Sequence, residues 1–559
     1  MSAYEPLNPL IVQSDHTVLV EVDSPRYAEA RNGLVRFAEL VKSPEHIHTY
    51  RVSPLSIWNA CAAGVRVDEI LDILTRFSKY AVPEHVAVQI REFASRYGRL
   101  RIIRQGPALC LEADDLPLAE EISRNKNIIP YLRERDGAKF IVDPGDRGRV
   151  KLALIKIGYP AEDLAGYTQG ESLPIELRSP TCEGKPFGLR HYQSSAVKAF
   201  HQGGGPRGGS GVIVLPCGAG KTIVGLAAMT QLQTSTLILA TNTTSVRQWM
   251  EEILDKTTLG EDLIGEYSGL RKDIRPVTVS TYQIMTHRKK VGESYVHLEL
   301  FDKRDWGLIL YDEVHLLPAP VFQITAGLQA RRRLGLTATL VREDGCEDDV
   351  FALIGPKKSD VPWKELEAEG WIAKARCTEI RVPLPPTLRM PYAIAEKREK
   401  FRIASENPAK HDIVNRIIQK HPNDRILVIG MYLDQLKKIA DELNAPLLTG
   451  SVGQKKRDVV FDDFKSGRIP VLVVSKIANF SVDLPDASVA IQISGMFGSR
   501  QEEAQRLGRI LRPKPGANQA YFYTVVSQDT REQDFALKRQ LFLCEQGYEY
   551  QILFEDDRT

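Results

Sequence analysis

The sequence predicts an α/β protein with two successive parallel-sheet lobes, preceded by small α/β modules. Short aliphatic runs alternate with helical stretches from residue 190 onward, and a second series of the same kind begins at residue 425. Strands that alternate with helices in this way form parallel sheets covered by helices. The runs are 212–215, 236–240, 277–280, 308–311 and 334–336 in the first series, and 425–430, 471–474, 487–493 and 520–525 in the second.

Length and composition limit the classes of protein that fit. The chain has 559 residues, too many for one hydrophobic core, which indicates three or four domains. A net charge of +2 excludes a histone-like basic surface but allows a local nucleic-acid groove. No apolar run is long enough to span a membrane, and no signal peptide is evident. The seven cysteines form no CxxC pair, which argues against zinc or iron–sulfur sites and favours a reducing, cytoplasmic location.

The N-terminal segment is expected to hold helices followed by a hairpin. Ser53 and Pro54 suit the start of a helix, and a second helix has an apolar stripe at Ile70, Ile73, Leu74 and Phe77. A third helix follows Pro83, and the runs 100–103 and 108–111 predict a hairpin. This order suggests a winged-helix-like unit, for which DNA contact and protein docking are equally good interpretations.

Three further segments are predicted besides the strands of the two lobes. A short unit has a strand at 140–142 and a helix at 150–157, and a proline-containing linker follows it. The glycine run 203–209 is expected to be a flexible loop, because no lysine follows at the spacing that a phosphate site needs. Residues 383–408, rich in proline and charge, are expected to form a small insertion between the lobes.

A glycine turn between a strand and a helix is the first candidate binding site. Backbone N–H groups and the positive end of a helix dipole face phosphate in such a turn. Lys221 is expected to reach the β- and γ-phosphates of ATP, and the Thr222 hydroxyl to bind Mg²⁺. The strict pattern would place glycine at Leu215, so this is a variant loop. Its residues are Pro216, Cys217, Gly218, Ala219, Gly220, Lys221 and Thr222, in which Cys217 is best explained as a small residue in a tight turn.

An acidic pair follows the apolar run 308–311. Such a pair is usually part of a solvated surface, but here it ends a strand that looks buried, and this favours a functional role. Asp312 is expected to hold Mg²⁺, and Glu313 to orient or deprotonate the attacking water. His315 is expected either to couple nucleotide state to movement or simply to pack and hydrogen-bond.

Two more segments fit a motor driven by ATP. The hydroxyls of Thr337 and Thr339, after the run 334–336, are suited to relay γ-phosphate occupancy. In the second lobe, Gln505, Arg509 and Arg512 are candidate catalytic residues, since the two arginines share a helix face and a guanidinium suits a transferring phosphoryl group. A solvent-facing basic helix is the alternative. The order of the motifs favours a site that the two lobes build together.

Together these segments resemble superfamily 2 helicases, and in detail the XPB family of DNA repair helicases. The loop 215–222 includes the family's Pro-Cys, and residues 312–315 match its Asp-Glu-Val-His box. Residues 337–344 carry the family's Arg-Glu-Asp element at Arg342, Glu343 and Asp344. The similarity spans most of the chain and continues at 50–57, 354–357, 503–509 and 527–530.

The resemblance implies two RecA-like lobes with ATP in their cleft and DNA across both. The expected domains are a winged-helix-like domain at 1–125, a damage-recognition-like module at 126–180, lobe 1 at 181–375, a thumb-like insertion at 383–408 and lobe 2 at 409–559. Arg190 and Gln193 match the adenine-reading segment, with Gln193 as the base contact. The Arg-Glu-Asp element is implicated in opening DNA, although a charged surface loop is the alternative.

The resemblance also implies partners and an activity. The implied ligands are ATP, Mg²⁺ and DNA at junctions of single and double strands, with a nuclease or repair complex as protein partner and no membrane. The chain lacks the long acidic inserts of eukaryotic members, which indicates a compact prokaryotic form, cytoplasmic and nucleoid-associated. One departure lies at 478–485, where the family's fifth motif is altered, so contacts to nucleic acid through that segment are expected to differ from the family's, whereas the hydrolysis residues are all present.

Several activities fit these motifs. The leading hypothesis is a 3′→5′ DNA helicase that acts in repair, with the polarity taken from the resemblance. The alternatives are a double-strand translocase that opens DNA only locally, a scaffold whose ATPase gates assembly with a nuclease, and an RNA helicase, since phosphate contacts do not distinguish the two sugars.

Overall fold

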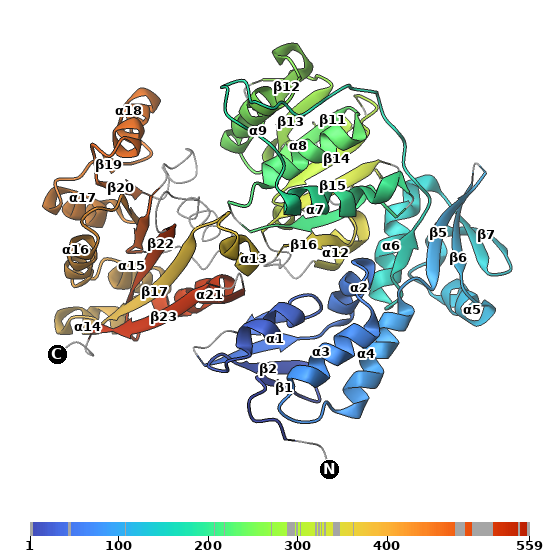
Figure 1. Ribbon diagram of the computed structural model, residues 1–559, viewed down its shortest axis with the longest axis horizontal. Coiled ribbons are helices and arrows are strands. Elements are labelled where there is room, and N and C mark those ends of the chain that lie inside the picture. The colour runs from blue at the N-terminus through green and yellow to red at the C-terminus, as the bar shows by residue number, and fades with distance from the viewer. Residues whose placement is uncertain are drawn as a thin grey trace. The chain divides into compact units, whose positions relative to one another are not determined.

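The computed structural model describes most of the chain (Figure 1). Contacts divide the chain into two compact units. The first comprises Met1–Glu39, Tyr50–Leu215 and Gly220–Val361, and the second comprises Leu40–Thr49, Pro216–Ala219 and Pro362–Thr559. The described residues are 4–42, 46–106, 108–205, 207–216, 218–269, 271–287, 297, 300–301, 303–318, 321, 325, 327–328, 331–338, 347–361, 363–475, 487–494, 518–545 and 548–555.

Short strands and four helices precede residue 97. Ser53 caps the second helix, as predicted, because its Oγ accepts a hydrogen bond from Ser56 N at 3.1 Å and Pro54 occupies the first turn. The apolar stripe predicted at 70–77 is also confirmed, with Ile70, Leu74 and Phe77 buried and Ile73 half-buried. The elements are β1 (Leu10–Val12) and β2 (Thr17–Glu21), which pair antiparallel, α1 (Tyr27–Leu34), β3 (Glu39–Lys42), β4 (Ile47–Arg51), α2 (Pro54–Ala62), α3 (Val67–Phe77) and α4 (Glu84–Arg96).

A five-stranded sheet of order β7-β8-β6-β5-β9 follows. Its strands are β5 (Leu100–Gln105), β6 (Ala108–Ala113), β7 (Leu132–Asp136), β8 (Lys139–Val142) and β9 (Ala161–Asp163), accompanied by α5 (Leu116–Arg124) and α6 (Arg147–Lys156).

The hairpin predicted at 100–111 forms, but it differs from the expectation in its partners. β6 pairs with β8, where Leu111 lies opposite Phe140, and β5 pairs with β9, where Leu100 lies opposite Ala161. Both edges of a hairpin present unpaired backbone groups, and later strands satisfy them here. The hairpin therefore belongs to a sheet with strands on both sides of residue 125. It does not complete a separate winged-helix-like unit within residues 1–125.

Lobe 1 is built on a seven-stranded sheet of order β12-β13-β11-β14-β15-β10-β16, in which every pair is parallel. All five predicted strands are confirmed, and β10, β11 and β13 are buried along their whole length, as strands covered on both faces are. Two strands escaped prediction because they are short, and one of them is the polar edge strand β16. The strands are β10 (Ser210–Val214), β11 (Thr236–Ala240), β12 (Ile264–Tyr267), β13 (Val277–Thr281), β14 (Leu308–Asp312), β15 (Arg332–Thr337) and β16 (Lys357–Asp360).

Helices of lobe 1 pack on this sheet and on the N-terminal modules. Trp58 of α2 and Ile155 of α6 join the hydrophobic core of the lobe, and the Asn59 side chain accepts a hydrogen bond from Lys357 N at 3.0 Å. Trp58 and Ile155 therefore extend the core of lobe 1 into the N-terminal part of the chain, whereas the five-stranded sheet and α6 have a core cluster of their own. The described helices of the lobe are α7 (His191–His201), α8 (Lys221–Leu232), α9 (Thr243–Lys256), α10 (Tyr282–Met285) and α12 (Glu347–Leu353).

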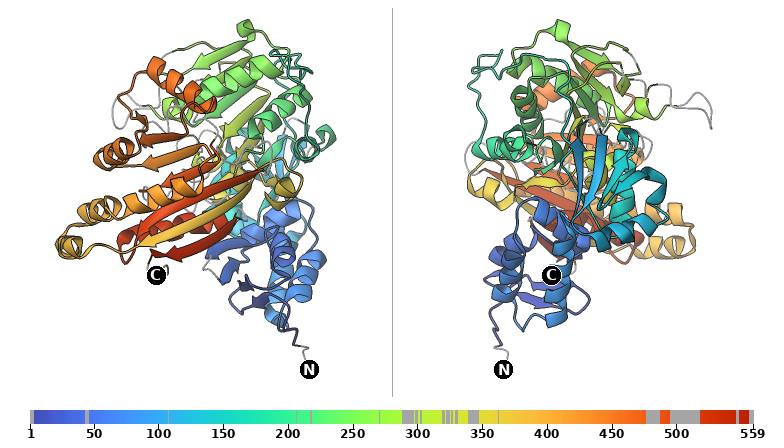
Figure 2. Two further views of the ribbon diagram at one scale, coloured as in Figure 1. Left: turned by 60° about the vertical axis from the view of Figure 1, so that its left-hand side comes forward. Right: turned by 90° about the vertical axis from the view of Figure 1, so that its right-hand side faces the viewer.

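The second unit contains another parallel seven-stranded sheet, of order β19-β20-β18-β21-β22-β17-β23. Figure 2 shows the gold β17 beside the red strands β22 and β23. This sheet confirms the second predicted lobe, although the charged β17 was not predicted as a strand. Its strands are β17 (Lys374–Val382), β18 (Ile426–Gly430), β19 (Leu447–Leu448), β20 (Val471–Ser475), β21 (Val489–Gln492), β22 (Gln519–Ser527) and β23 (Glu549–Phe554).

Helices surround this second sheet. The segment expected to form an insertion contains α14 (Pro386–Ile394) and α15 (Lys397–Ser405). The others described are α13 (Trp363–Ala368), α16 (Lys410–Lys420), α17 (Leu433–Glu442), α18 (Gln454–Lys465) and α21 (Arg531–Glu545). No helix within the described ranges combines the length and apolarity that a membrane crossing requires.

Candidate nucleotide site of lobe 1

The carboxyl ends of three adjacent strands meet at one edge of the lobe 1 sheet. β14, β15 and β10 are neighbours and run parallel, so Asp312, Thr337 and the turn after Val214 lie at the same edge. Leu215 N donates a hydrogen bond to Thr337 O at 2.9 Å, which ties the start of that turn to β15. Ligands of parallel α/β sheets bind at this edge. The predicted residues of lobe 1 that the structure describes are therefore gathered in one place.

The turn after β10 leads directly into α8. Gly220 precedes the helix with φ +82°, a left-handed conformation that glycine adopts without strain. A Cβ at Gly220 would lie 2.6 Å from Nε2 of Gln193, so the backbone approaches this side chain closely. Lys221 and Thr222 are the first two residues of α8, at the positive end of its dipole. The predicted succession of a strand, a glycine turn and the start of a helix is therefore confirmed.

An ion pair joins the turn to the acidic box. Nζ of Lys221 lies 2.5 Å from Oε1 of Glu313, and each side chain is 14% exposed. Burial pushes the pKa of Glu313 upward, but the positive charges of Lys221 and His315 outweigh this effect and leave it below the ordinary value. Glu313 is therefore ionised at neutral pH. Its own backbone is left-handed, at φ +51°, which turns the chain sharply at the end of β14.

Asp312 is held by two aromatic residues that the sequence analysis did not identify. Nε1 of Trp249 donates a hydrogen bond to Oδ2 of Asp312 at 3.0 Å, and the Tyr282 hydroxyl donates one to its backbone O at 2.9 Å. Burial and the neighbouring Glu313 raise the pKa of Asp312 to about 6. Trp249 lies on α9 and Tyr282 on α10, far from Asp312 in sequence, so no local pattern marks them.

His315, three residues after Asp312, lies against Thr337. Its Nδ1 is 2.7 Å from Oγ1 of Thr337 and 3.6 Å from Oε2 of Glu313. Because Thr337 O also accepts the bond from Leu215 N, these contacts connect the acidic box, β15 and the turn. The structure thus places His315 in polar contact with Thr337 and Glu313, an arrangement that fits both interpretations of this residue.

Gln193 and Arg190 lie at the start of α7. The backbone N of Arg190 donates to Oε1 of Gln193 at 3.0 Å, and Gln193 is 3% exposed. Arg190 also donates from Nη1 to the hydroxyl of Tyr192 at 3.0 Å. These bonds fix the Gln193 amide beside Gly220, next to the turn that was predicted to bind phosphate.

Some predicted site residues lie outside the described part of the chain. They are Cys217, Thr339, Arg342, Glu343, Asp344, Gln505, Arg509 and Arg512.

The side chains at this edge suit a nucleotide with Mg²⁺. Mg²⁺ is held in proteins by one or two carboxylates together with substrate phosphates and water. Within the described ranges, no group of three or more His, Cys, Asp or Glu gathers into a site that could hold a metal by itself. The half-buried Asp312 carboxylate and the Thr222 hydroxyl, beside a turn too tight for a Cβ at Gly220, fit that kind of shared site.

Comparison with known protein families covers most of the chain. The model of the ERCC3/RAD25/XPB C-terminal helicase matches residues 366–559, which contain the second sheet. A model described as a helicase conserved C-terminal domain matches residues 10–136, and one of a type III restriction enzyme, res subunit, matches residues 186–342. The last range contains the edge with Lys221, Asp312 and Glu313.

Several known proteins are similar to this chain along almost its whole length. The "DNA 3'-5' helicase XPB" of Kineococcus radiotolerans is 55% identical over 98% of this chain and 97% of its own. The protein of that name from Mycobacterium tuberculosis is 55% identical over 98% of each chain. The "General transcription and DNA repair factor IIH helicase/translocase subunit XPB" of Danio rerio is 32% identical over 98% of this chain and 79% of its own. The chain therefore belongs to the XPB family of helicases.

Proposed function

We propose that this chain is an ATP-dependent 3′→5′ DNA helicase that couples ATP hydrolysis to strand separation in DNA repair. The observation that carries the proposal is the Lys221–Glu313 ion pair beside the half-buried Asp312. This arrangement occurs in a chain that is 55% identical, over nearly its whole length, to proteins named as DNA 3'-5' helicases.

Each residue of the edge has a proposed role. Lys221 binds the β- and γ-phosphates, and Thr222 and Asp312 hold Mg²⁺, which neutralises phosphate charge when bound. Glu313, ionised at neutral pH, orients the attacking water or takes its proton. Gln193, with Arg190, reads the adenine base. A nucleotide phosphate that attracts Lys221 weakens the Lys221–Glu313 pair and so leaves the Glu313 carboxylate to act on water.

The remaining predicted residues complete the proposal. His315 and Thr337, which are in contact, relay the state of the nucleotide. Thr339 continues that relay, and the Arg342, Glu343 and Asp344 element opens DNA. Gln505, Arg509 and Arg512 of lobe 2 stabilise charge on the transferring phosphoryl group, an effect of about 10³–10⁵ in rate for an arginine finger.

The Lys221→Ala variant of the full chain tests the proposal. ATP hydrolysis and unwinding of a 3′-tailed DNA duplex are both expected to be lost, whereas the exposed Lys198→Ala variant on α7 keeps both. ATPase stimulation by matched DNA and RNA strands is measured alongside. Undiminished unwinding by Lys221→Ala, unwinding only of 5′-tailed substrates, or stronger stimulation by RNA would contradict the proposal.

A double-strand translocase is the second candidate. Two observations favour it: the name of the Danio rerio relative includes translocase, and the fifth motif at 478–485 departs from the family pattern. Displacement of a triplex strand without unwinding of a tailed duplex would favour this activity over the first.

We propose that 1–125 and 126–180, which share the five-stranded sheet, form modules that contact DNA or a partner. We assign 383–408 to a thumb, and 181–375 and 409–559 to the lobes. DNA at strand junctions is the proposed substrate, and a nuclease or repair complex is the proposed protein partner. Co-purification of the tagged chain from nuclease-treated cells of its source tests for that partner and for a cytoplasmic, nucleoid-associated location.

A further inference from the structure

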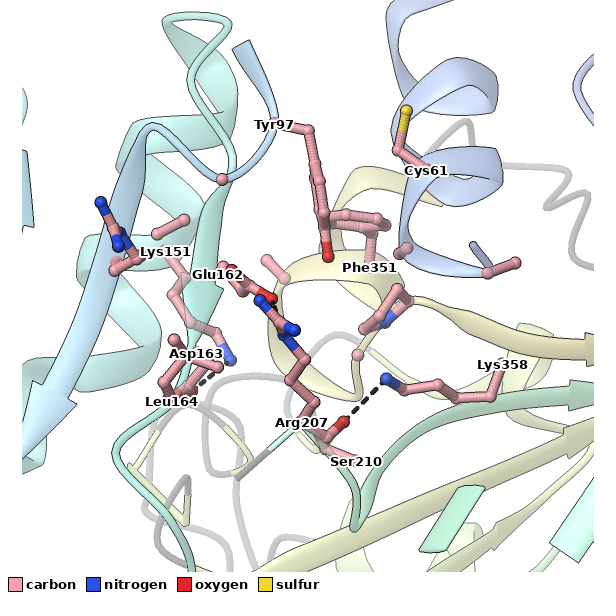
Figure 3. Close-up of a pocket in the computed structure, with 18 of the residues that line it drawn as sticks. Cys61, Tyr97, Lys151, Glu162, Asp163, Leu164, Arg207, Ser210, Phe351 and Lys358 are labelled. Carbon is pink, nitrogen blue, oxygen red and sulfur yellow. Dashed lines mark hydrogen bonds and ion pairs between the residues drawn. The ribbon is translucent and has the colours of Figure 1, made fainter. Parts of the chain in front are cut away.

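The first unit contains a cavity of about 790 Å³, remote from the nucleotide edge (Figure 3). Ser210, which begins β10, and Lys358 of β16 line it, whereas the nucleotide edge lies beyond Val214 at the other end of β10. Five strand residues span about 13 Å at ~3.3 Å per residue. The cavity is therefore a separate site at the amino ends of the strands.

The walls of the cavity come from three parts of the unit. Cys61 of α2 and Tyr97, directly after α4, come from the N-terminal segment, and Lys151, Glu162 and Asp163 belong to the module of the five-stranded sheet. Lobe 1 contributes Arg207, Ser210, Phe351 and Lys358, among others. A volume of this size is within the range of about 300–1,000 Å³ that small-molecule sites occupy. The cavity is thus large enough for a nucleotide-sized ligand.

Cationic side chains outnumber carboxylates in the lining. The lining has five cationic side chains, Arg99, Arg101, Lys151, Arg207 and Lys358, and three carboxylates, Asp114, Glu162 and Asp163. Arg99 pairs at 2.5 Å with Asp115, which lies outside the lining, so the excess is one positive charge. Buried charges are normally balanced by opposite charges, because an unbalanced ion in a poorly solvated place is costly. The imbalance favours an anion in the cavity.

Positive charge is most concentrated around the Asp163 carboxylate. This carboxylate receives Nη2 of Arg147 at 2.6 Å and Nζ of Lys151 at 3.1 Å, the second of which is drawn in Figure 3. Arg333, fully buried, lies near enough to lower the pKa of Lys151, and its Nε donates to Leu353 O at 2.7 Å. Two buried cations therefore pair with the Asp163 carboxylate, and a third lies nearby. Burial lowers the pKa of Lys151 to about 7, against the opposing charge of Asp163 and with smaller contributions from Arg333 and Arg147.

A second pair of cations lies across the cavity, on lobe 1. Nζ of Lys358 donates to Arg207 O at 2.8 Å, and Nε of Arg207 lies 2.6 Å from Oε1 of Glu162. Burial lowers the pKa of Lys358 to about 8, although the charge of Glu162 partly opposes that effect. A bound anion would favour the charged forms of Lys358 and Lys151.

Apolar surface completes the lining. Figure 3 shows the rings of Tyr97 and Phe351 on the side of the cavity away from Lys358 and Ser210. Phosphate needs cationic donors, and an aromatic or sugar ring needs flat apolar surface. The geometry points to a binding site for a small phosphorylated molecule of nucleotide size, which we propose as a second ligand site of this protein.

The extent of acetylation at Lys358, measured in the full chain without substitutions, tests the proposal. At pH 8, trace acetic anhydride is added with and without 5′-AMP or inorganic phosphate, at matched ionic strength, and labelling is measured by mass spectrometry. Protection of Lys358 is expected, with no protection of Lys357, which pairs with Asp360 at 2.8 Å and does not line the cavity. No protection, or equal protection by sodium chloride, would overturn the proposal.

Two further arms exclude other sources of protection. In the Lys221→Ala chain, protection is expected to persist, and its loss would mean that the effect is transmitted from the nucleotide edge and would overturn the proposal. Stronger protection by an oligothymidylate than by 5′-AMP would assign the cavity to a nucleic-acid strand and would likewise overturn it.

Matched variants give an independent measure of affinity. Isothermal titration of 5′-AMP or inorganic phosphate is expected to show binding about tenfold weaker in Lys358→Met than in Lys357→Met, because a charge-assisted hydrogen bond is lost. Arg207→Gln serves as the second variant if Lys358→Met does not fold. Equal affinities in a folded site variant and in Lys357→Met would overturn the proposal.

Discussion

Trp249 fixes the carboxylate of Asp312 through a hydrogen bond of 3.0 Å from its indole Nε1 to Oδ2. The ring is 2% exposed and reaches across from α9 to the end of β14. Gly225 of α8 makes room for it, since a Cβ there would lie 2.5 Å from Cη2 of the indole. Three elements therefore determine which way the proposed Mg²⁺ ligand points.

Trp249→Phe should slow ATP hydrolysis with little change in folding. The phenyl ring preserves most of the packing, but the half-buried carboxylate loses its donor, a loss worth ~1.5–3 kcal/mol for a charged acceptor. We expect kcat to fall about tenfold or more, with partial recovery at high Mg²⁺, in a steady-state ATPase assay. Trp306→Phe is the matched control, because its Nε1 donates instead to Leu300 O at 3.0 Å. An equal fall in both variants would contradict the assignment.

The acidic edge should make stability depend on pH. Burial and Glu313 raise the pKa of Asp312 to about 6, so the folded chain holds a proton that the unfolded chain releases near pH 4. The contribution of Asp312 to stability therefore falls as pH rises from about 4 to about 6. Asp312→Asn removes this titration, and its stability relative to the unsubstituted chain should rise across that window by on the order of 2 kcal/mol.

Thermal unfolding of both chains between pH 4 and 7 measures this difference. The exposed Gln283→Ala is the control, and its difference from the unsubstituted chain should stay constant across the window because the change removes no titrating group. A constant difference for Asp312→Asn as well would show that the carboxylate is not perturbed as described.

The parts of this site that the sequence predicts are those with a local signature. A buried aliphatic strand, a glycine turn and a helix start are adjacent in the chain, so the sequence of 212–222 is enough to predict this succession of elements. The Lys221–Glu313 contact joins distant residues, yet it follows from the rule that parallel strands meet at their carboxyl ends.

Contacts that depend on tertiary packing escaped prediction. The bond from Trp249 to Asp312 requires α9 to direct one aromatic side chain at a strand end, and many helical tryptophans simply fill a core. The hairpin at 100–111 was predicted correctly as a hairpin, but its partners β8 and β9 lie later in the chain. Strand β17 alternates charged and buried residues, and its place between β22 and β23 depends on segments more than a hundred residues away.

Gly220→Ala should impair nucleotide binding more than stability. At φ +82°, alanine is strained by about 1–2 kcal/mol, and its Cβ would lie 2.6 Å from Nε2 of Gln193. The backbone of the turn must then shift where phosphate is expected to bind. We expect the KM for ATP to rise about tenfold or more, as measured by ATPase titration. Gly269→Ala, where no atom lies within 4 Å of the added Cβ, should leave KM unchanged. A normal KM in Gly220→Ala would argue against a phosphate loop here.

Thr337→Val should weaken the stimulation of ATP hydrolysis by DNA. Valine keeps the shape of the buried threonine but removes the hydroxyl that lies 2.7 Å from Nδ1 of His315, whereas the backbone bond from Leu215 N to Thr337 O is retained. Loss of one such bond, about 1 kcal/mol, should lower the DNA-stimulated ATPase rate about fivefold and leave the basal rate within twofold. The ratio of the two rates is the measurement. Thr325→Val, which loses a hydroxyl contact to Tyr311 at 3.1 Å, is the control, and an equal loss of stimulation there would refute a specific role for His315 and Thr337.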